Sequence, residues 1–171
     1  MLLLNPKALL LALPLLAAAC GFTPVYAPGG TGSQLHGKIE IQAPEDIDGA
    51  SGSDAYFLVQ HLEQRLGRGG SAAYRLNLRL STQEEGQAIT ADNEITRYSV
   101  IGTADYALTR QSDGKVTSSG TVRNFTGYSA TGSTVETLAG ERDAHNRLMV
   151  ILADQITAQI LATADLSAPA E

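Results

Sequence analysis

The residue types that most often carry chemistry are few in this chain and lie far apart. The three histidines stand at positions 36, 61 and 145, on three different predicted elements. None has a metal-ligand spacing, and His61-Leu62-Glu63 does not match the H-E-x-x-H pattern of metalloproteases. We interpret all three as exposed surface histidines.

Two acidic groups, Glu84-Glu85 and Asp92-Asn93-Glu94, fall in a predicted polar connection. They lack the glycine and the spacing of an EF-hand, so we expect at most weak binding of a divalent cation. We predict no metal site and no cofactor.

A nucleophile is also missing from the pattern. The segment Gly127-Tyr128-Ser129-Ala130-Thr131 approaches the G-x-S-x-G elbow of hydrolases, but Thr131 stands where the second glycine is needed. Nothing else combines a nucleophile, a base and an oxyanion hole. We predict no catalytic residues and a protein that is not an enzyme.

The single cysteine, Cys20, excludes an intramolecular disulfide and a cysteine-based zinc cluster. It follows an apolar run, 8–19, whose helix would be about 18 Å long, too short to cross a membrane and typical of a secretory leader. Leu16-Ala17-Ala18-Ala19-Cys20 resembles a bacterial lipobox, whereas ordinary cleavage would leave a free exposed thiol. We predict a signal peptide over 1–19, lipidation of Cys20 and, because Gly21 follows, sorting to the outer membrane.

Length and composition limit the fold and function classes that the rest of the chain can belong to. The chain has 171 residues, a net charge of −6 and 43% hydrophobic residues, which fits one folded domain after the leader. The acidic balance argues against sequence-independent binding of nucleic acid, which needs a basic face.

Hydrophobic periodicity predicts the elements that position these residues. Alternating patterns predict strands over 35–42, 74–80, 97–110 and 116–128, and helical spacing predicts helices over 53–66 and 141–163. The long segment 83–96 is expected to be a polar loop, Asp113-Gly114 a tight hairpin turn, and Gly102 a bulge or close backbone approach. The order β-α-β-β-β-α predicts an α+β two-layer sandwich.

The expected domain organisation follows the same pattern. Residues 20–33, rich in Pro, Gly and Ser, are expected to form a lipidated tether, 34–164 a single domain, and 165–171 a flexible tail. Ser133 to Glu136 matches a capping box, and the last helix has an apolar stripe of Leu148, Leu152, Ile156 and Ile160, with a pause expected at Gly140.

Six cations lie on or beside predicted strands: Arg75, Arg79, Arg97, Arg110, Lys115 and Arg123. Residue by residue, solubilising charge on a wet face is the simpler interpretation. The alternative is an anion site, because arginine matches phosphate bidentately.

Short motifs resemble one known family. Cys20-Gly21-Phe22-Thr23-Pro24-Val25-Tyr26 resembles the start of the mature LptE lipoproteins that assemble lipopolysaccharide, in a form that looks alphaproteobacterial. Leu152-Ala153-Asp154-Gln155-Ile156 is similar to the closing helix of that family, and Thr96-Arg97 and Asp113-Gly114 are consistent with it.

The resemblance implies a four-stranded, mainly antiparallel sheet with two helices on one face. It also implies an outer-membrane lipoprotein, anchored on the periplasmic side, whose domain plugs the lumen of the LptD β-barrel, assists its assembly and binds lipopolysaccharide. By charge and position we select Arg97, beside the expected long loop, and Lys115, in the hairpin turn, as lipopolysaccharide contacts at one anion-binding tip.

Two other classes stay open at this point. One is an auxiliary lipoprotein subunit of another envelope transporter of the ABC type, which would co-purify with that complex and not with a large barrel. The other is a lipid-anchored cell-wall enzyme, against which the scattered histidines argue.

Overall fold

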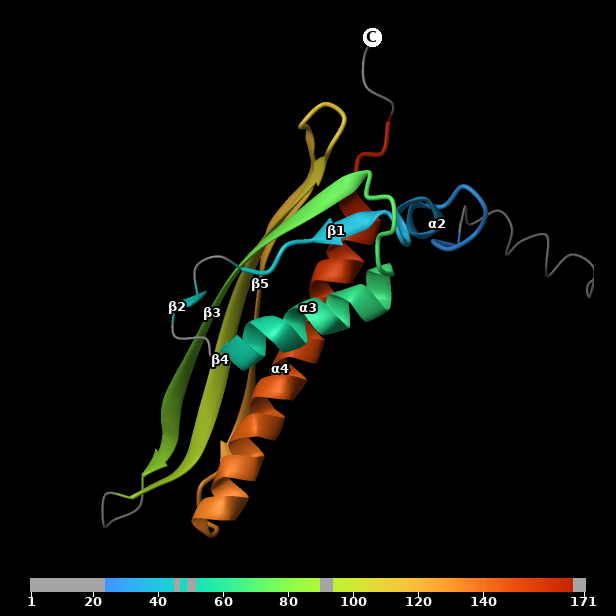
Figure 1. Ribbon diagram of the computed structural model, residues 1–171. Helices are drawn as coiled ribbons and strands as arrows, with labels where there is room; N and C mark the ends of the chain where they lie inside the picture. The colour runs from blue at the N-terminus through green and yellow to red at the C-terminus, as the bar shows by residue number, and fades with distance from the viewer. Residues whose placement is uncertain (1–23, 45–46, 49–51, 90–93, 168–171) are drawn as a thin grey trace, which may run out of the picture.

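The computed structural model describes residues 24–44, 47–48, 52–89 and 94–167. Along the chain it contains α2 (Thr31–Leu35), β1 (Ile39–Ile41), β2 (Ile47–Asp48), α3 (Gly52–Leu66), β3 (Tyr74–Ile89), β4 (Ile95–Arg110), β5 (Val116–Ser129) and α4 (Thr134–Thr163) (Figure 1). No helix in these ranges is long and apolar enough to cross a membrane.

The sheet has the order β1-β3-β4-β5, and β3, β4 and β5 pair antiparallel. Both β1 and β2 pair parallel with the same edge of β3, so the sheet is four strands wide. The parallel pairing follows from α3, which lies between β2 and β3 and returns the chain to the starting end of the sheet. The predicted α+β class and the mainly antiparallel sheet are confirmed.

Both long helices lie on one face of the sheet (Figure 1). Alternate strand residues supply the core beneath them; Leu80, Ala104 and Val122, for example, are paired across three strands and are all buried. The predicted stripe of α4 is confirmed, since all four of its residues are fully buried. The close approach predicted at Gly102 is also confirmed, because a Cβ there would lie 3.0 Å from side-chain atoms of Leu148 and Leu152.

The N-terminal segment differs from the predicted tether and first strand. Residues 31–35 form α2 with Gly32 and Leu35 buried, and strand β1 begins only at Ile39. Gly37, at φ 71°, turns the chain between the two elements. The period-2 pattern therefore placed Leu35 correctly in the core but assigned it to the wrong element.

The predicted long loop over 83–96 is wrong. Strands β3 and β4 extend through most of it, with pairing as far as Ile89 and Ile95. Here the hairpin runs beyond the main core, so both faces of its strands carry polar residues and the sequence resembles a loop. The predicted pause at Gly140 is wrong as well, since α4 is continuous from its capping box at Ser133 and Glu136 to Thr163.

Candidate functional site

The predicted lipidation residue, Cys20, and the predicted signal peptide lie outside the described residues. Lipidation therefore stays a prediction.

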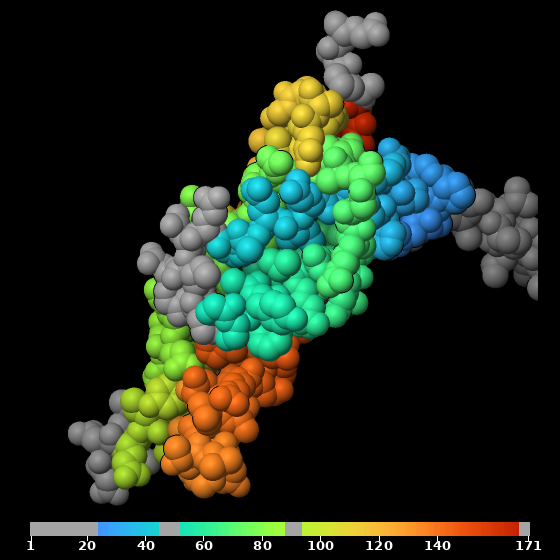
Figure 2. Space-filling view, viewed as in Figure 1, coloured from blue at the N-terminus to red at the C-terminus, as the bar shows by residue number. Residues whose placement is uncertain are grey.

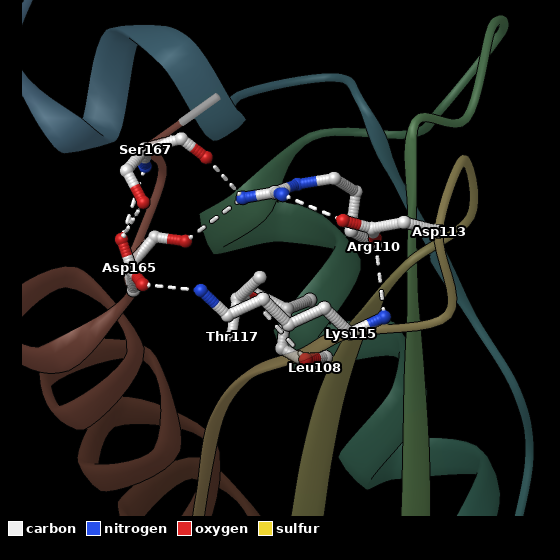
Figure 3. A network of polar contacts seen from close by, with 7 residues as sticks. All are labelled: Leu108, Arg110, Asp113, Lys115, Thr117, Asp165 and Ser167. Atoms are coloured by element: carbon white, nitrogen blue, oxygen red, sulfur yellow. Dashed lines mark hydrogen bonds and ion pairs between the residues drawn. The ribbon is translucent and has the colours of Figure 1, made fainter. Parts of the chain in front are cut away.

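The turn between β4 and β5 holds the predicted contact residue Lys115 in a polar network (Figure 3). Lys115 Nζ lies 2.7 Å from Asp165 Oδ2. The buried Arg110 donates to Asp113 at 3.0 Å and to the carbonyl oxygens of Asp165 at 3.2 Å and Ser167 at 2.6 Å. Arg110 and Lys115 thus bind the residues that follow α4 and hold them against the end of the sheet.

This network changes two expectations. Hydrogen bonds from Lys115 and then from Ser167 hold the pKa of Asp165 well below its usual range, so a carboxylate balances the Lys115 charge. The segment 165–167 is tied down, with Leu166 packed against the core, so a flexible tail is wrong for these three residues.

The other predicted contact, Arg97, lies near the opposite end of the sheet. It is exposed on β4, pairs in register with Ser129, and forms no ion pair with any described residue. Arg110, the last residue of β4, lies thirteen positions further along the strand, a distance of about 40 Å. Arg97 and Lys115 therefore do not form the single anion-binding tip that was expected.

The face of the sheet opposite α3 and α4, here called the open face, carries most of the strand arginines. Its strand positions alternate with the core positions. They hold four arginines and four acidic residues: Arg75, Arg79, Arg97 and Arg123 with Glu40, Asp48, Glu85 and Asp105. Phe125 is 68% exposed there, beside a shallow hollow also lined by Ile101 and Arg123. Arginines and acidic residues are therefore equal in number on this face, whereas the whole chain has a net charge of −6.

A second polar assembly, here called the His145 cluster, consists of Asp54, Glu84, Glu141 and His145. Asp54 lies in the first turn of α3, Glu84 on β3, and Glu141 and His145 one turn apart on α4. In Figure 2 α3 lies across the middle of the molecule, and the N-terminal part of α4 extends beyond it beside the β3–β4 hairpin. The cluster forms where the three elements converge.

Within the cluster, His145 bridges two carboxylates. Its Nδ1 lies 2.8 Å from Asp54 Oδ2, and its Nε2 lies 3.2 Å from Glu84 Oε1. The hydrogen bond to Asp54, followed by the charges of Asp54 and Glu84, raises the pKa of His145 to about 9 against an opposing effect of burial. His145 is therefore a cation at neutral pH, and both ring N–H groups donate.

Two neighbours complete the surroundings. Burial, and then the negative charges of Glu84 and Glu141, raise the pKa of Tyr128 to about 12, and its hydroxyl lies 3.4 Å from Glu84. Thr82 donates its hydroxyl to Asp54 Oδ2 at 3.2 Å. Asp54 Oδ1 is buried without a hydrogen-bond partner among the described residues, at the wall of a cleft of about 740 Å³.

The interpretation of His145 as an exposed surface residue is therefore wrong, since its side chain is only 18% exposed. His61 is also partly buried and lies 3.2 Å from Asn146 Oδ1, whereas His36 is exposed as expected. The spacing of four between Glu141 and His145 was the one local signal, because such residues share a helix face. No sequence spacing relates either residue to Asp54 or Glu84.

The elbow-like segment does not form a nucleophile site in the part of the chain that the structure describes. Ser129 Oγ lies 2.9 Å from the Thr131 hydroxyl, and among the described residues it forms no hydrogen bond with a histidine.

Comparison with known proteins agrees with this architecture. A family model described as "LptE: Lipopolysaccharide-assembly" matches residues 38–160. No curated protein shows significant sequence similarity to the chain.

Three solved structures share the fold. A protein of Caulobacter crescentus CB15 described as a candidate lipoprotein is 22% identical with a TM-score of 0.60, over 77% of this chain and 92% of that one. The rare lipoprotein B of Shewanella oneidensis is 12% identical with a TM-score of 0.53, over 72% and 93%. A lipoprotein B of Nitrosomonas europaea is 11% identical with a TM-score of 0.52, over 72% and 81%. At these identities the similarity shows the fold alone.

Proposed function

Because the chain belongs to the LptE family of lipopolysaccharide-assembly lipoproteins, we propose that it is an outer-membrane lipoprotein that binds lipopolysaccharide and plugs an LptD-type β-barrel. The family match, which spans α3, all three long strands and most of α4, is the observation that carries this proposal. The family is one of non-enzymatic lipoproteins, and we propose the same for this chain.

The open face supports a role in contact with a polar partner. Three of its arginines, Arg79, Arg97 and Arg123, form no ion pair with described residues. Lipid A and the inner-core sugars carry phosphates and carboxylates, and a guanidinium group binds such anions bidentately. A sheet face that no described helix covers also presents the polar surface that a water-filled barrel lumen would accept.

The two selected contact residues are expected to contribute unequally. Arg97 is exposed and forms no ion pair with a described residue, so its charge is available to an anionic ligand. Lys115 must first give up its 2.7 Å ion pair with Asp165. We propose Arg97 as the stronger contact and expect a smaller contribution from Lys115.

Affinity purification tests the barrel partnership. The full chain, tagged after Glu171, is isolated from detergent-solubilised outer membranes, and its partners are identified by mass spectrometry. Recovery of a large β-barrel in equal amount supports the proposal. Recovery of an ABC-type complex without a barrel would establish the alternative, an auxiliary transporter lipoprotein.

Charge reversal tests the ligand contact. Arg97→Asp is expected to weaken lipopolysaccharide binding and to reduce its salt dependence, because a screened charge contact is lost. Arg142→Asp is the matched control, since Arg142 is an exposed arginine on α4, outside the open face, and forms no ion pair with a described residue. Equal affinities of Arg97→Asp and the wild type across a salt series, with circular dichroism showing both folded, would exclude Arg97 as a contact.

A further inference from the structure

We propose that Glu84, Glu141 and His145 form a binding site for a divalent transition-metal ion. One oxygen of each carboxylate and one ring nitrogen of His145 all lie within 4.8 Å of one another. The three residues come from β3 and from successive turns of α4, so the site joins two elements that meet only in the folded chain. This inference is independent of the proposed lipopolysaccharide function.

The orientation of His145 is the first argument. Its Nδ1 is held by Asp54 Oδ2 at 2.8 Å, and its Nε2 faces the carboxylate of Glu84. In metal proteins a carboxylate commonly holds one ring nitrogen of a histidine in this way, fixing the ring while the other nitrogen binds the ion. Asp54 is thus a positioning residue, and Nε2, which donates to Glu84 without the ion, is the ring nitrogen that would bind the ion.

The buried carboxylate of Asp54 is the second, independent argument. The Asp54 side chain is 1% exposed and borders the cleft, and its Oδ1 is buried without a hydrogen-bond partner among the described residues. A buried carboxylate oxygen without a partner is costly. Three carboxylates surround the single positive charge of His145, and the opposite charges of Arg142 and Asp143, which also line the cleft, cancel. A doubly charged ion in the cleft would therefore reduce an excess of negative charge.

The donor set indicates the class of ion. One imidazole nitrogen and two carboxylate oxygens, without sulfur, suit Zn²⁺ and the neighbouring divalent ions better than Mg²⁺ or Ca²⁺, which prefer oxygen alone. In a tetrahedral Zn²⁺ site the donor atoms lie about 3.3 Å apart, so these donors must approach one another by rotation of side chains. Glu84 is exposed and Glu141 is half-buried, so both have room for that movement.

Binding is a simple exchange. The Nε2 lone pair forms the bond to the ion, the Nε2 proton passes to solvent, and the hydrogen bond from Nε2 to Glu84 is replaced by coordination of both groups to the same ion. The bound ion would connect β3 to α4 and stabilise the folded state by RT ln(1 + c/Kd), where c is the concentration of the ion, so that the stability rises with that concentration.

Calorimetric titration with ZnCl2 tests the proposal. The full chain is purified in detergent, stripped with EDTA, dialysed, and treated with an alkylating reagent so that no free thiol binds the ion. We expect one Zn²⁺ per chain, a rise in melting temperature with Zn²⁺, and neither effect with MgCl2. Co²⁺ in place of Zn²⁺ is expected to give visible absorption bands typical of nitrogen and oxygen ligands.

Matched variants identify the ligands. Glu84→Gln with Glu141→Gln removes two donors and should weaken Zn²⁺ binding more than tenfold. Glu40→Gln with Glu85→Gln removes the same charge from the open face, outside the cleft, and should leave Zn²⁺ binding unchanged. Asp54→Asn, which loses the positioning carboxylate, should weaken binding about 10- to 100-fold.

Three results would overturn the proposal. The first is a wild-type chain that binds no Zn²⁺ by calorimetry. The second is equal loss of binding in the control pair. The third is a Co²⁺ spectrum of the wild type without ligand-field bands, a measurement that does not depend on any variant folding.

Discussion

Replacing His145 by leucine is expected to destabilise the protein strongly, because it leaves the Asp54 carboxylate buried without its positive partner. The Asp54 side chain is 1% exposed and that of His145 18%. Of the hydrogen bonds to Asp54 described above, only the one from the Thr82 hydroxyl, at 3.2 Å, would remain. Removing one member of a buried pair costs about 3–5 kcal/mol. We expect the lower end, since one edge of the His145 ring reaches solvent.

A second substitution makes the reasoning sharper. Asp54→Asn added to His145→Leu removes the buried charge while keeping an acceptor for Thr82. The double variant should therefore be more stable than His145→Leu alone, although it carries one more substitution. Chemical denaturation in EDTA, followed by circular dichroism, measures the free energy of unfolding of each variant.

The pH dependence supplies a third comparison. The pKa of His145 is raised to about 9, against about 6.5 in an unfolded chain. A raised pKa means that the stabilisation by the cation is complete below about pH 6.5 and is lost as the pH rises through about 9. The difference between wild type and His145→Leu should narrow over that range. A single variant within about 0.5 kcal/mol of the wild type, or a double variant no more stable than the single one, would refute the assignment.

Three further predictions concern the core, a turn and the anchor. Because Leu152 is fully buried, Leu152→Ala should lower the free energy of unfolding by about 2–5 kcal/mol, and Leu152→Asp should prevent folding. Thermal melts measure both effects, with Leu138→Asp, at a site 45% exposed, as the control. Gly67→Ala should lower the free energy of unfolding by about 1–2 kcal/mol, because Gly67 has φ 79° and a Cβ there would lie 2.8 Å from the Gly37 nitrogen. In the control variant Gly70→Ala the added Cβ meets no atom within 4 Å, so its melting temperature should equal that of the wild type. Cys20→Ala should abolish acylation and leave the melting temperature unchanged, since the buried apolar residues of the described part of the chain begin at Leu35. Mass spectrometry that shows an unmodified Cys20 in the wild type would contradict the lipoprotein prediction.

The parts of the fold that the sequence predicted are those in which the local pattern and the tertiary environment agree. The alternation at Leu76, Leu78 and Leu80 marks one buried face, and the stripe of α4 marks another. The hydrophobic pattern gave a wrong prediction where one strand passes from the buried core into solvent. Strand β3 leaves the main core near Glu84, so its distal residues are polar on both faces although their backbone pairing continues.

The candidate site was predictable only in part, because its members meet through the crossing of three elements. Glu141 and His145 share a helix face. Asp54 and Glu84, however, lie 91 and 61 positions before His145 in the sequence. Asp54 is a charged residue that lies buried in the first turn of α3, and burial of such a residue follows from its tertiary partners and not from the local sequence. Likewise, charge and position in the hairpin turn selected Lys115, whereas its ion pair with Asp165 depends on where α4 ends.

The alternation along β5 separates two kinds of residue that a mutational scan should distinguish. Val122 and Thr126 point toward the helices and are buried, so their replacement acts through stability and should impair every function of the protein together. Arg123 and Phe125, between them in the chain, lie on the open face and have few partners within the domain. Substitutions of the second pair are therefore expected to weaken binding of a partner or a ligand while the protein stays folded. An uncovered sheet face contributes little to the core, so most of its contacts must come from other molecules.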